Sequence, residues 1–112
     1  MSGITTHVLD TARGRPAAGI DVVLEKVEAG GGAHVIGEGR TDGDGRVRSL
    51  LNGSAAPGAY RLTFTTRPYF DAQGITTFYP YVAIVFEVAP GQSHYHVPLL
   101  ISPFGYTTYR GS

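Results

Sequence analysis

Glycine and proline interrupt this chain at short intervals, and the segments between them are rich in tyrosine, phenylalanine, valine, isoleucine and threonine. The 112 residues include 16 glycines and 7 prolines, so turn-forming residues are never far apart. β-Branched and aromatic residues favour strands, and frequent turn residues keep those strands short. The sequence therefore predicts an all-β fold, and its length fits a single domain over residues 1–112.

Residues 59–66 show the strand pattern most clearly. Tyr60, Leu62 and Phe64 alternate with polar residues, which places the apolar side chains on one face of a strand. Pro98 lies in another such segment and predicts a sheet edge or a bulge there, because proline has no backbone N–H. Short strands with turns between them are typical of a two-sheet sandwich. Seven or eight strands are expected, at residues 4–9, 20–27, 33–40, 46–51, 59–66, 78–88, 94–101 and 106–110.

The segment after residue 66 breaks the strand pattern. Pro68 suits the first turn of a helix and Gly74 suits its C-terminal end, so one short helix is predicted between them. Residues 10–19 show no alternation, and we expect a loop there. Residues 78–88 are apolar on nearly both faces, whereas an antiparallel sandwich strand commonly has one face in water. This excess of apolar surface predicts association between subunits.

The charge and cysteine content argue against several classes of function. The formal net charge is zero, whereas binding to nucleic acids or anionic membranes requires a concentrated basic surface. The chain has no cysteine, which excludes disulfides, thiolate metal ligands and a cysteine nucleophile. No basic-then-apolar leader is visible, and no apolar stretch approaches the roughly 20 residues that span a bilayer. We therefore expect a cytoplasmic protein without nucleic-acid or membrane partners.

The histidines allow two interpretations. His94 and His96 are two residues apart, so a regular strand places them on the same face. Neutral imidazoles bind zinc well, and His7 or His34 would supply a third ligand. However, the chain has no H-E-x-x-H spacing, and a pair of histidines in a strand is also compatible with a structural or exposed position. His7, taken alone, has the same structural alternative.

Arg46 directly follows the turn sequence TDGDG at residues 41–45. A turn fixes the backbone, so the guanidinium that leaves it can be aimed at a carbonyl or an oxyanion. A solvated arginine at a strand start is the alternative. Asp42 and Asp44 resemble the start of a calcium loop, but an EF-hand needs a glutamate at the twelfth position, and neither count supplies a side-chain oxygen there. Turn formation explains both aspartates.

The C-terminal sequence Tyr109-Arg110-Gly111-Ser112 places an aromatic ring, a guanidinium, a hydroxyl and a carboxylate where chains usually fray. Glycine lets a backbone approach other groups closely, and the carboxylate can orient a histidine or a water. A frayed end without a role is the alternative on these residues alone.

Three segments together resemble the 5-hydroxyisourate hydrolase branch of the transthyretin-like family. They are THVLDTARGRPAAGI near the start, TDGDGR near the middle and HYHVPLLISPFGYTTYRGS at the end. The resemblance covers essentially the whole chain, and the terminal Tyr-Arg-Gly-Ser is its most specific element. It implies a transthyretin-like two-sheet sandwich and a homotetramer with its sites in channels where two dimers meet.

The resemblance also implies roles for individual residues. It implies catalytic roles for His7, Arg46 and His96, whereas His94 lies outside that set. It implies neither a metal nor an organic cofactor. We expect the imidazoles of His7 and His96 to converge with the guanidinium groups of Arg46 and Arg110 around one cavity. The implied substrate-binding residues are Thr108, Tyr109, Arg110, Gly111 and Ser112.

The activity that the resemblance implies is hydrolysis of 5-hydroxyisourate, the immediate product of urate oxidation, to 2-oxo-4-hydroxy-4-carboxy-5-ureidoimidazoline. A histidine, either His96 or His7, would activate water because its pKa lies near working pH. Arg46 would stabilise the oxyanion, and Arg110 would hold the planar substrate. The alternative is a non-catalytic carrier of a small ligand on the same fold.

Overall fold

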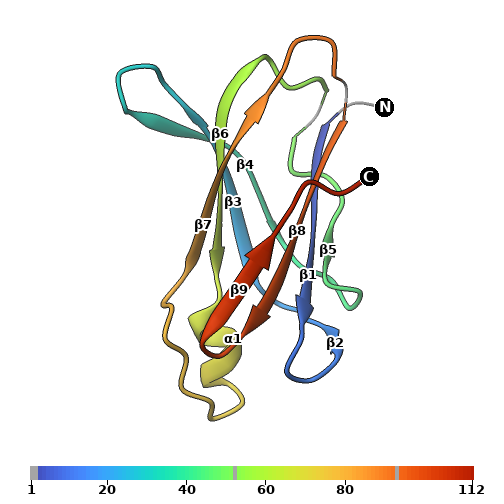
Figure 1. Ribbon diagram of the computed structural model, residues 1–112, viewed down its shortest axis with the longest axis vertical. Coiled ribbons are helices and arrows are strands. Elements are labelled where there is room, and N and C mark those ends of the chain that lie inside the picture. The colour runs from blue at the N-terminus through green and yellow to red at the C-terminus, as the bar shows by residue number, and fades with distance from the viewer. Residues whose placement is uncertain (1–2, 52, 93) are drawn as a thin grey trace.

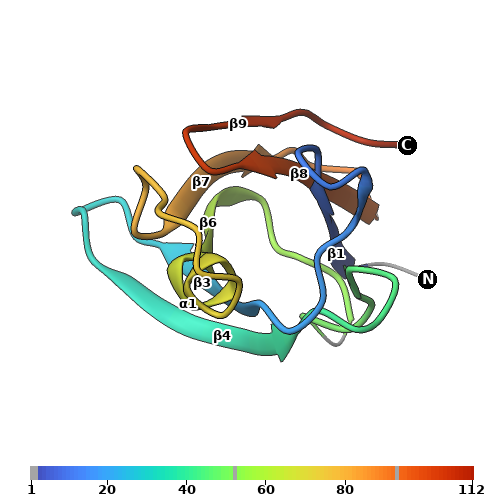
Figure 2. The same ribbon diagram turned by 90° about the horizontal axis from the view of Figure 1, so that it is seen from below.

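The computed structural model describes residues 3–51, 53–92 and 94–112, which form two β-sheets (Figure 1). Figure 2 shows these sheets as two layers, and Figure 1 shows the helix α1 (Arg67–Asp71) at one end of them. The architecture confirms the predicted all-β sandwich with a short helix between Pro68 and Gly74. The first sheet has the order β2 (Arg15–Pro16), β1 (Gly3–Asp10), β8 (His94–Ser102) and β9 (Gly105–Thr108), with β5 (Arg46–Val47) also paired to β1. The second has the order β4 (Ala33–Arg40), β3 (Asp21–Val27), β6 (Gly58–Thr65) and β7 (Val82–Val88).

The core lies between the sheets and is built from alternate residues of their strands. In β6, the side chains of Tyr60, Leu62 and Phe64 are buried, as their alternation predicts. In β1, Ile4 and Val8 are buried in the same core. Because successive strand residues point to opposite faces, the odd-numbered residues of β1 lie on the outer face of the first sheet.

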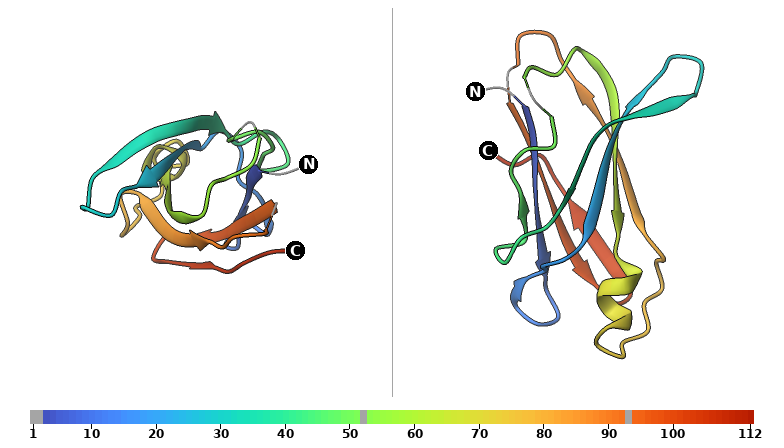
Figure 3. Two further views of the ribbon diagram at one scale, coloured as in Figure 1. Left: turned by 90° about the horizontal axis from the view of Figure 1, so that it is seen from above. Right: turned by 180° about the vertical axis from the view of Figure 1, so that it is seen from behind.

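β1 and β8 pair in parallel, which brings the two ends of the chain together. The register places Thr5 opposite His96 and Leu9 opposite Leu100. Figures 1 and 3 show these strands side by side, with the C-terminal segment close to them. Side chains that are far apart in the sequence therefore share one surface of the first sheet.

The predicted strand at residues 46–51 is shorter in the structure, where β5 ends at Val47. Leu50 is buried in the core, and the backbone there lies against Gly37 of β4, which has no side chain to obstruct it. Burial of Leu50 thus draws the chain away from β1 after two bridged pairs, His7 with Arg46 and Thr6 with Val47.

The last strand, predicted at residues 106–110, ends at Thr108 in the structure. Two further boundaries differ from the sequence prediction. The strand predicted at residues 78–88 begins at Val82, because its partner β6 has turned into α1 beyond Thr65 and leaves no strand for residues 78–81 to pair with. The loop predicted at residues 10–19 contains the two-residue strand β2, which pairs with the end of β1. The start of β7 and the presence of β2 cannot be predicted from the local sequence, because each depends on how far a neighbouring strand extends.

Pro98 lies in β8 between β1 and β9, so it is not on an edge strand. It marks an interruption in the pairing with the C-terminal segment. The β8–β9 ladder begins at the Leu99–Thr108 pair, and the next pairing along β8 is the isolated bridge of His96 with Gly111. Because proline has no N–H to donate, the chain leaves β8 here and returns to it at Gly111.

The outer face of β7 is apolar at Ala83 and Val85, as the sequence indicates, and Glu87 is exposed at its end. Val85 is 62% exposed, and several aromatic side chains near this edge are also exposed, namely Phe78, Tyr81, Phe104 and Tyr109. Such a surface favours association with another chain. No helix in the described part of the chain has the length and apolarity that a membrane crossing requires.

Candidate active site

The outer face of the first sheet collects the polar residues singled out in the sequence. β1 presents Thr5 and His7 on this face, β8 presents His96, and β5 presents Arg46. The strand register places His7 opposite Arg46 and Thr5 opposite His96. Three strands from three regions of the chain thus bring these four side chains to one surface.

A hydrogen-bonded turn fixes the position of Arg46. The Asp42 carboxylate accepts backbone N–H groups of Asp44 at 2.9 Å and of Arg46 at 3.0 Å. The bond from the Arg46 backbone is the largest cause that lowers the pKa of Asp42, so this carboxylate stays ionised. Gly45 has a φ of 76°, which glycine adopts without strain, and its carbonyl accepts the Val8 N–H at 2.7 Å. This turn therefore holds the start of β5 against β1.

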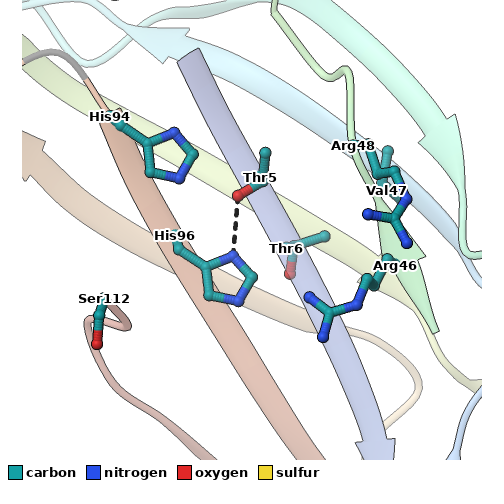
Figure 4. Close-up of a pocket in the computed structure, with 8 residues that line it drawn as sticks. All are labelled: Thr5, Thr6, Arg46, Val47, Arg48, His94, His96 and Ser112. Atoms are coloured by element: carbon teal, nitrogen blue, oxygen red, sulfur yellow. Dashed lines mark hydrogen bonds between the residues drawn. The ribbon is translucent and has the colours of Figure 1, made fainter. Parts of the chain in front are cut away.

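A cavity of about 290 Å³ lies beside these residues (Figure 4). It is open to solvent on one side, and its walls carry two guanidinium groups, two imidazoles and two hydroxyl-bearing threonines. Such a lining suits a small polar ligand better than an apolar one. The residues that line the cavity are Thr5, Thr6, Arg46, Val47, Arg48, His94, His96 and Ser112.

His96 is the half-buried imidazole of this cavity. Its Nδ1 atom lies 2.8 Å from Oγ1 of Thr5, within hydrogen-bonding distance. Burial lowers the pKa of His96 below its usual value, and the nearby Arg46, His7 and His94 lower that pKa further, because each disfavours a second positive charge. His96 is therefore neutral at neutral pH, which is the state that can accept a proton.

The C-terminal segment lies directly on His96. The Gly111 N–H donates to the His96 carbonyl oxygen at 2.8 Å. A β-carbon at position 111 would lie 2.7 Å from Cδ2 of the His96 ring and 3.1 Å from Cγ of Pro98, so a side chain there would force a shift. Glycine thus permits the terminal chain to reach the imidazole, and Ser112 then lines the cavity.

The residues just before Gly111 do not line the cavity beside His96. Tyr109 and Arg110 line a second pocket of about 410 Å³ between β7 and the C-terminal segment. The Arg110 guanidinium carbon lies 4.4 Å from the centre of the Tyr95 ring, and its Nη2 donates to the Gln92 side chain at 3.2 Å. Thr108 also lines this pocket, and its hydroxyl donates to the Pro98 carbonyl at 2.7 Å. Within one chain, Arg110 is therefore separate from Arg46.

Arg48 is the second guanidinium of the cavity in place of Arg110. The sequence carried a signal for it, since Arg46 and Arg48 are two residues apart and an extended chain places them on one face. His94, which the sequence interpretation placed outside the catalytic set, lines the cavity, whereas His7, which was expected there, is not among the lining residues. The role of Thr5 had no signal in the sequence, because it depends on the β1–β8 register.

The alternative of a metal site at His94 and His96 requires a third ligand, and the described residues do not supply one. Among residues 3–51, 53–92 and 94–112, no three histidine, cysteine, aspartate or glutamate side chains are grouped closely enough to hold a metal ion. His34 lies on β4 of the other sheet, where its Nδ1 is 2.8 Å from a Glu28 carboxylate oxygen. It is therefore remote from His94 and His96.

Comparison with known proteins identifies the family of this chain. The profile of the HIUase/Transthyretin family matches residues 4–111. The chain is 46% identical to a 5-hydroxyisourate hydrolase of Caulobacter vibrioides, with all of both chains covered. It is 44% identical to a 5-hydroxyisourate hydrolase of Salmonella typhi, over 97% of this chain and 80% of that protein.

Solved structures show the same fold. The transthyretin of Sparus aurata superposes with a TM-score of 0.92 at 34% identity, covering 99% of this chain and 97% of the other. The Klebsiella pneumoniae 5-hydroxyisourate hydrolase superposes with a TM-score of 0.86 at 33% identity, covering 100% of this chain and 94% of the other. On its sequence and its fold, this chain belongs to the HIUase/Transthyretin family.

Proposed function

We propose that this protein hydrolyses 5-hydroxyisourate to 2-oxo-4-hydroxy-4-carboxy-5-ureidoimidazoline in urate degradation. The observation that carries the proposal is the neutral, half-buried imidazole of His96 in a polar cavity that Arg46 also lines. The names of the relatives support it. They include an Arabidopsis thaliana uric acid degradation bifunctional protein that is 46% identical over 97% of this chain and 37% of that protein.

The chemistry requires a base, an acid and a site for negative charge. The Nε2 atom of His96 takes a proton from water, and the water oxygen attacks the ring carbonyl. Arg46 stabilises the resulting oxyanion, since its guanidinium is a fixed cation with aligned donors. Collapse of the oxyanion breaks the C–N bond, and the imidazolium returns the proton to the leaving nitrogen. His7, beside Arg46 in the register, acts as the second imidazole, which orients the water.

The terminal residues divide into two groups in this proposal. Ser112 lines the cavity within one chain and so binds substrate directly, while Gly111 lies against His96 and allows Ser112 to reach that position. Thr108, Tyr109 and Arg110 face the pocket beside β7, so their substrate contacts depend on a second subunit. A homotetramer is therefore part of the proposal, and the exposed apolar face of β7 supports it.

A carrier of a small apolar ligand is the second candidate. Sea bream transthyretin in complex with thyroxine superposes with a TM-score of 0.90 at 34% identity, covering 96% of this chain and 93% of the other, so the fold alone does not distinguish carrier from enzyme. The guanidinium and imidazole groups on the cavity walls support the enzyme, because they disfavour an apolar occupant there.

An ultraviolet time course tests the proposal. Urate is oxidised enzymatically in the cuvette, and the decay of 5-hydroxyisourate is followed with and without this protein. We expect the protein to accelerate the decay in proportion to its concentration, and a chelator to leave the rate unchanged. Decay at the spontaneous rate, together with stoichiometric ligand binding, would instead favour the carrier.

The pH dependence of kcat/KM follows from the lowered pKa of His96. A base acts only when it is unprotonated, so the rate falls as the pH drops through the pKa of His96 in the free enzyme. Since that pKa lies below 6.5, the acid limb of the profile should have its midpoint below pH 6.5. Measurement of kcat/KM between about pH 5 and 8 checks this, and a midpoint above 6.5 would contradict the assignment of His96 as the base.

Replacement of Gly111 by alanine should impair turnover without unfolding the protein. The new β-carbon would press on the His96 ring, and a displacement of about 1 Å at a catalytic group costs up to about 100-fold in rate. We expect kcat to fall about 10- to 100-fold in steady-state assays. Gly30→Ala is the matched control, because nothing lies within 4 Å of a β-carbon there. Equal activity of both variants would show that the terminal segment does not position His96.

A further inference from the structure

Thr5 and His96 face each other across the parallel β1–β8 pair. The register makes them direct partners, and Oγ1 of Thr5 lies 2.8 Å from Nδ1 of His96 (Figure 4). Both side chains are half-buried on the outer face of the sheet. The strand pairing fixes the positions of their backbones. The register of the sheet therefore holds the two side chains within hydrogen-bonding distance.

This hydrogen bond can take two forms with opposite chemical consequences. A neutral imidazole carries its proton on one nitrogen and a lone pair on the other. If Nδ1 carries the proton and donates it to Thr5, the Nε2 lone pair is free. If the hydroxyl of Thr5 donates to Nδ1, then Nε2 carries the proton and His96 cannot accept one from water there.

The surroundings of Nε2 favour the first form. Figure 4 shows the second ring nitrogen of His96 directed toward the side of the cavity where Arg46 lies. A guanidinium offers only N–H donors and a positive charge. A lone pair on Nε2 is attracted to that group, whereas an N–H on Nε2 would be repelled by it.

We propose that Thr5 is a positioning residue, which accepts the Nδ1–H of His96 and so keeps the Nε2 lone pair directed into the cavity. The inference rests on the proposed hydrolase function, for which His96 is the base. During the reaction, Nε2 gains the proton of the attacking water and later releases it to the leaving nitrogen. The Nδ1 proton stays on Nδ1 throughout, and Thr5 exchanges no proton with substrate.

Thr5 is the group best placed to accept the Nδ1–H of His96, as the other charged and titratable groups around the imidazole show. Arg46 approaches from β5 and has no acceptor, while His7 of β1 and His94 of β8 contribute charge that disfavours the imidazolium. Ser112 lines the same cavity from the C-terminal segment. Of these groups and Thr5, the structure places the Thr5 hydroxyl in hydrogen-bonding contact with the imidazole.

Two substitutions of Thr5 separate the hydroxyl from the shape of the side chain. Thr5→Val keeps the β-branched shape and the strand preference but removes the hydroxyl, whereas Thr5→Ser keeps the hydroxyl. We expect Thr5→Val to lower kcat about tenfold and to leave KM within about twofold, since one hydrogen bond of ordinary strength is lost. Thr5→Ser should keep kcat within about threefold of the unsubstituted protein. An equal loss in both variants would overturn the role of the hydroxyl.

Nitrogen NMR of histidine-labelled protein reads the tautomer directly and needs no substrate. The His96 signals are assigned by their loss in His96→Asn. At pH 8, we expect the unsubstituted protein and Thr5→Ser to show His96 protonated at Nδ1, and Thr5→Val to show a mixture of the two tautomers. An Nε2-protonated His96 in the unsubstituted protein, or an unchanged tautomer in Thr5→Val, would overturn the proposal.

The two readouts keep this proposal distinct from the proposed function. If 5-hydroxyisourate is not hydrolysed, the function fails, while the spectra still decide whether Thr5 sets the tautomer. If hydrolysis occurs and the tautomer changes in Thr5→Val without any loss of kcat, Thr5 orients the ring but does not serve catalysis. That result would also overturn the proposal. Should Thr5→Val fail to fold, the tautomer of the unsubstituted protein and the kcat of Thr5→Ser still decide it.

Discussion

Replacement of His96 by asparagine should lower kcat for 5-hydroxyisourate about 10²- to 10⁴-fold, which is the usual contribution of a general acid–base group. Asparagine keeps a polar side chain of similar reach but has no basic nitrogen. Its amide can still contact Thr5, so the β1–β8 pairing should persist and the oligomeric state should not change. The measurement is the initial rate under substrate saturation, with size-exclusion chromatography on the same sample.

His34→Asn is the matched control for this substitution. His34 lies on β4 in the other sheet, where it is exposed and pairs with Glu28. The control should keep the rate of the unsubstituted protein. If His96→Asn also kept that rate, His96 would have no part in the mechanism, and His7 would become the candidate base.

Replacement of Arg46 by glutamine should lower kcat/KM about 10²- to 10³-fold, because one preorganised donor to an oxyanion is typically worth that much. The Asp42 turn should survive, since it uses the backbone N–H of Arg46 and not its side chain. The same variant removes a positive charge that lowers the pKa of His96. The acid limb of the residual activity should therefore move to higher pH. Both effects are read from one set of pH-rate measurements.

Arg40→Gln removes the same charge from a position remote from the cavity, where Arg40 pairs with Asp21 at 2.9 Å on the second sheet. It should change neither kcat/KM nor the acid limb. A loss in Arg40→Gln as large as in Arg46→Gln would mean that the net charge of the protein matters and the local oxyanion contact does not.

Local patterns predicted most of the strands. The alternation of Tyr60, Leu62 and Phe64 is visible within one segment, and the structure confirms that these side chains are buried. Strand ends that depend on a neighbouring strand were not predicted. Residues 78–81 have the composition of a strand, but β6 ends before it could pair with them. The burial of Leu50 ends β5 for a similar reason, since the core draws that residue inward.

The sequence identified several residues of the candidate site. It did not predict how all of these residues are placed relative to one another. The resemblance pointed to His7, Arg46 and His96, and the structure brings their strands together. The chain segment after Thr108 leaves β8 at Pro98, so Arg110 turns toward Tyr95 and away from the cavity. The direction of the Arg110 side chain depends on this interruption of the strand pairing. The spacing of residues in the sequence does not predict it.

The parallel pairing of β1 with β8 has a consequence for biosynthesis. β1 leaves the ribosome before its long parallel partner β8, so one edge of β1 stays unpaired while the residues between the two strands are synthesised. An open edge is a template for wrong pairing with another nascent chain. It is closed only by a contact between residues 91 positions apart, which is a slow kind of contact to form. A product released before β8 is synthesised therefore lacks His96, and it presents that edge to the chaperones and proteases of the cell.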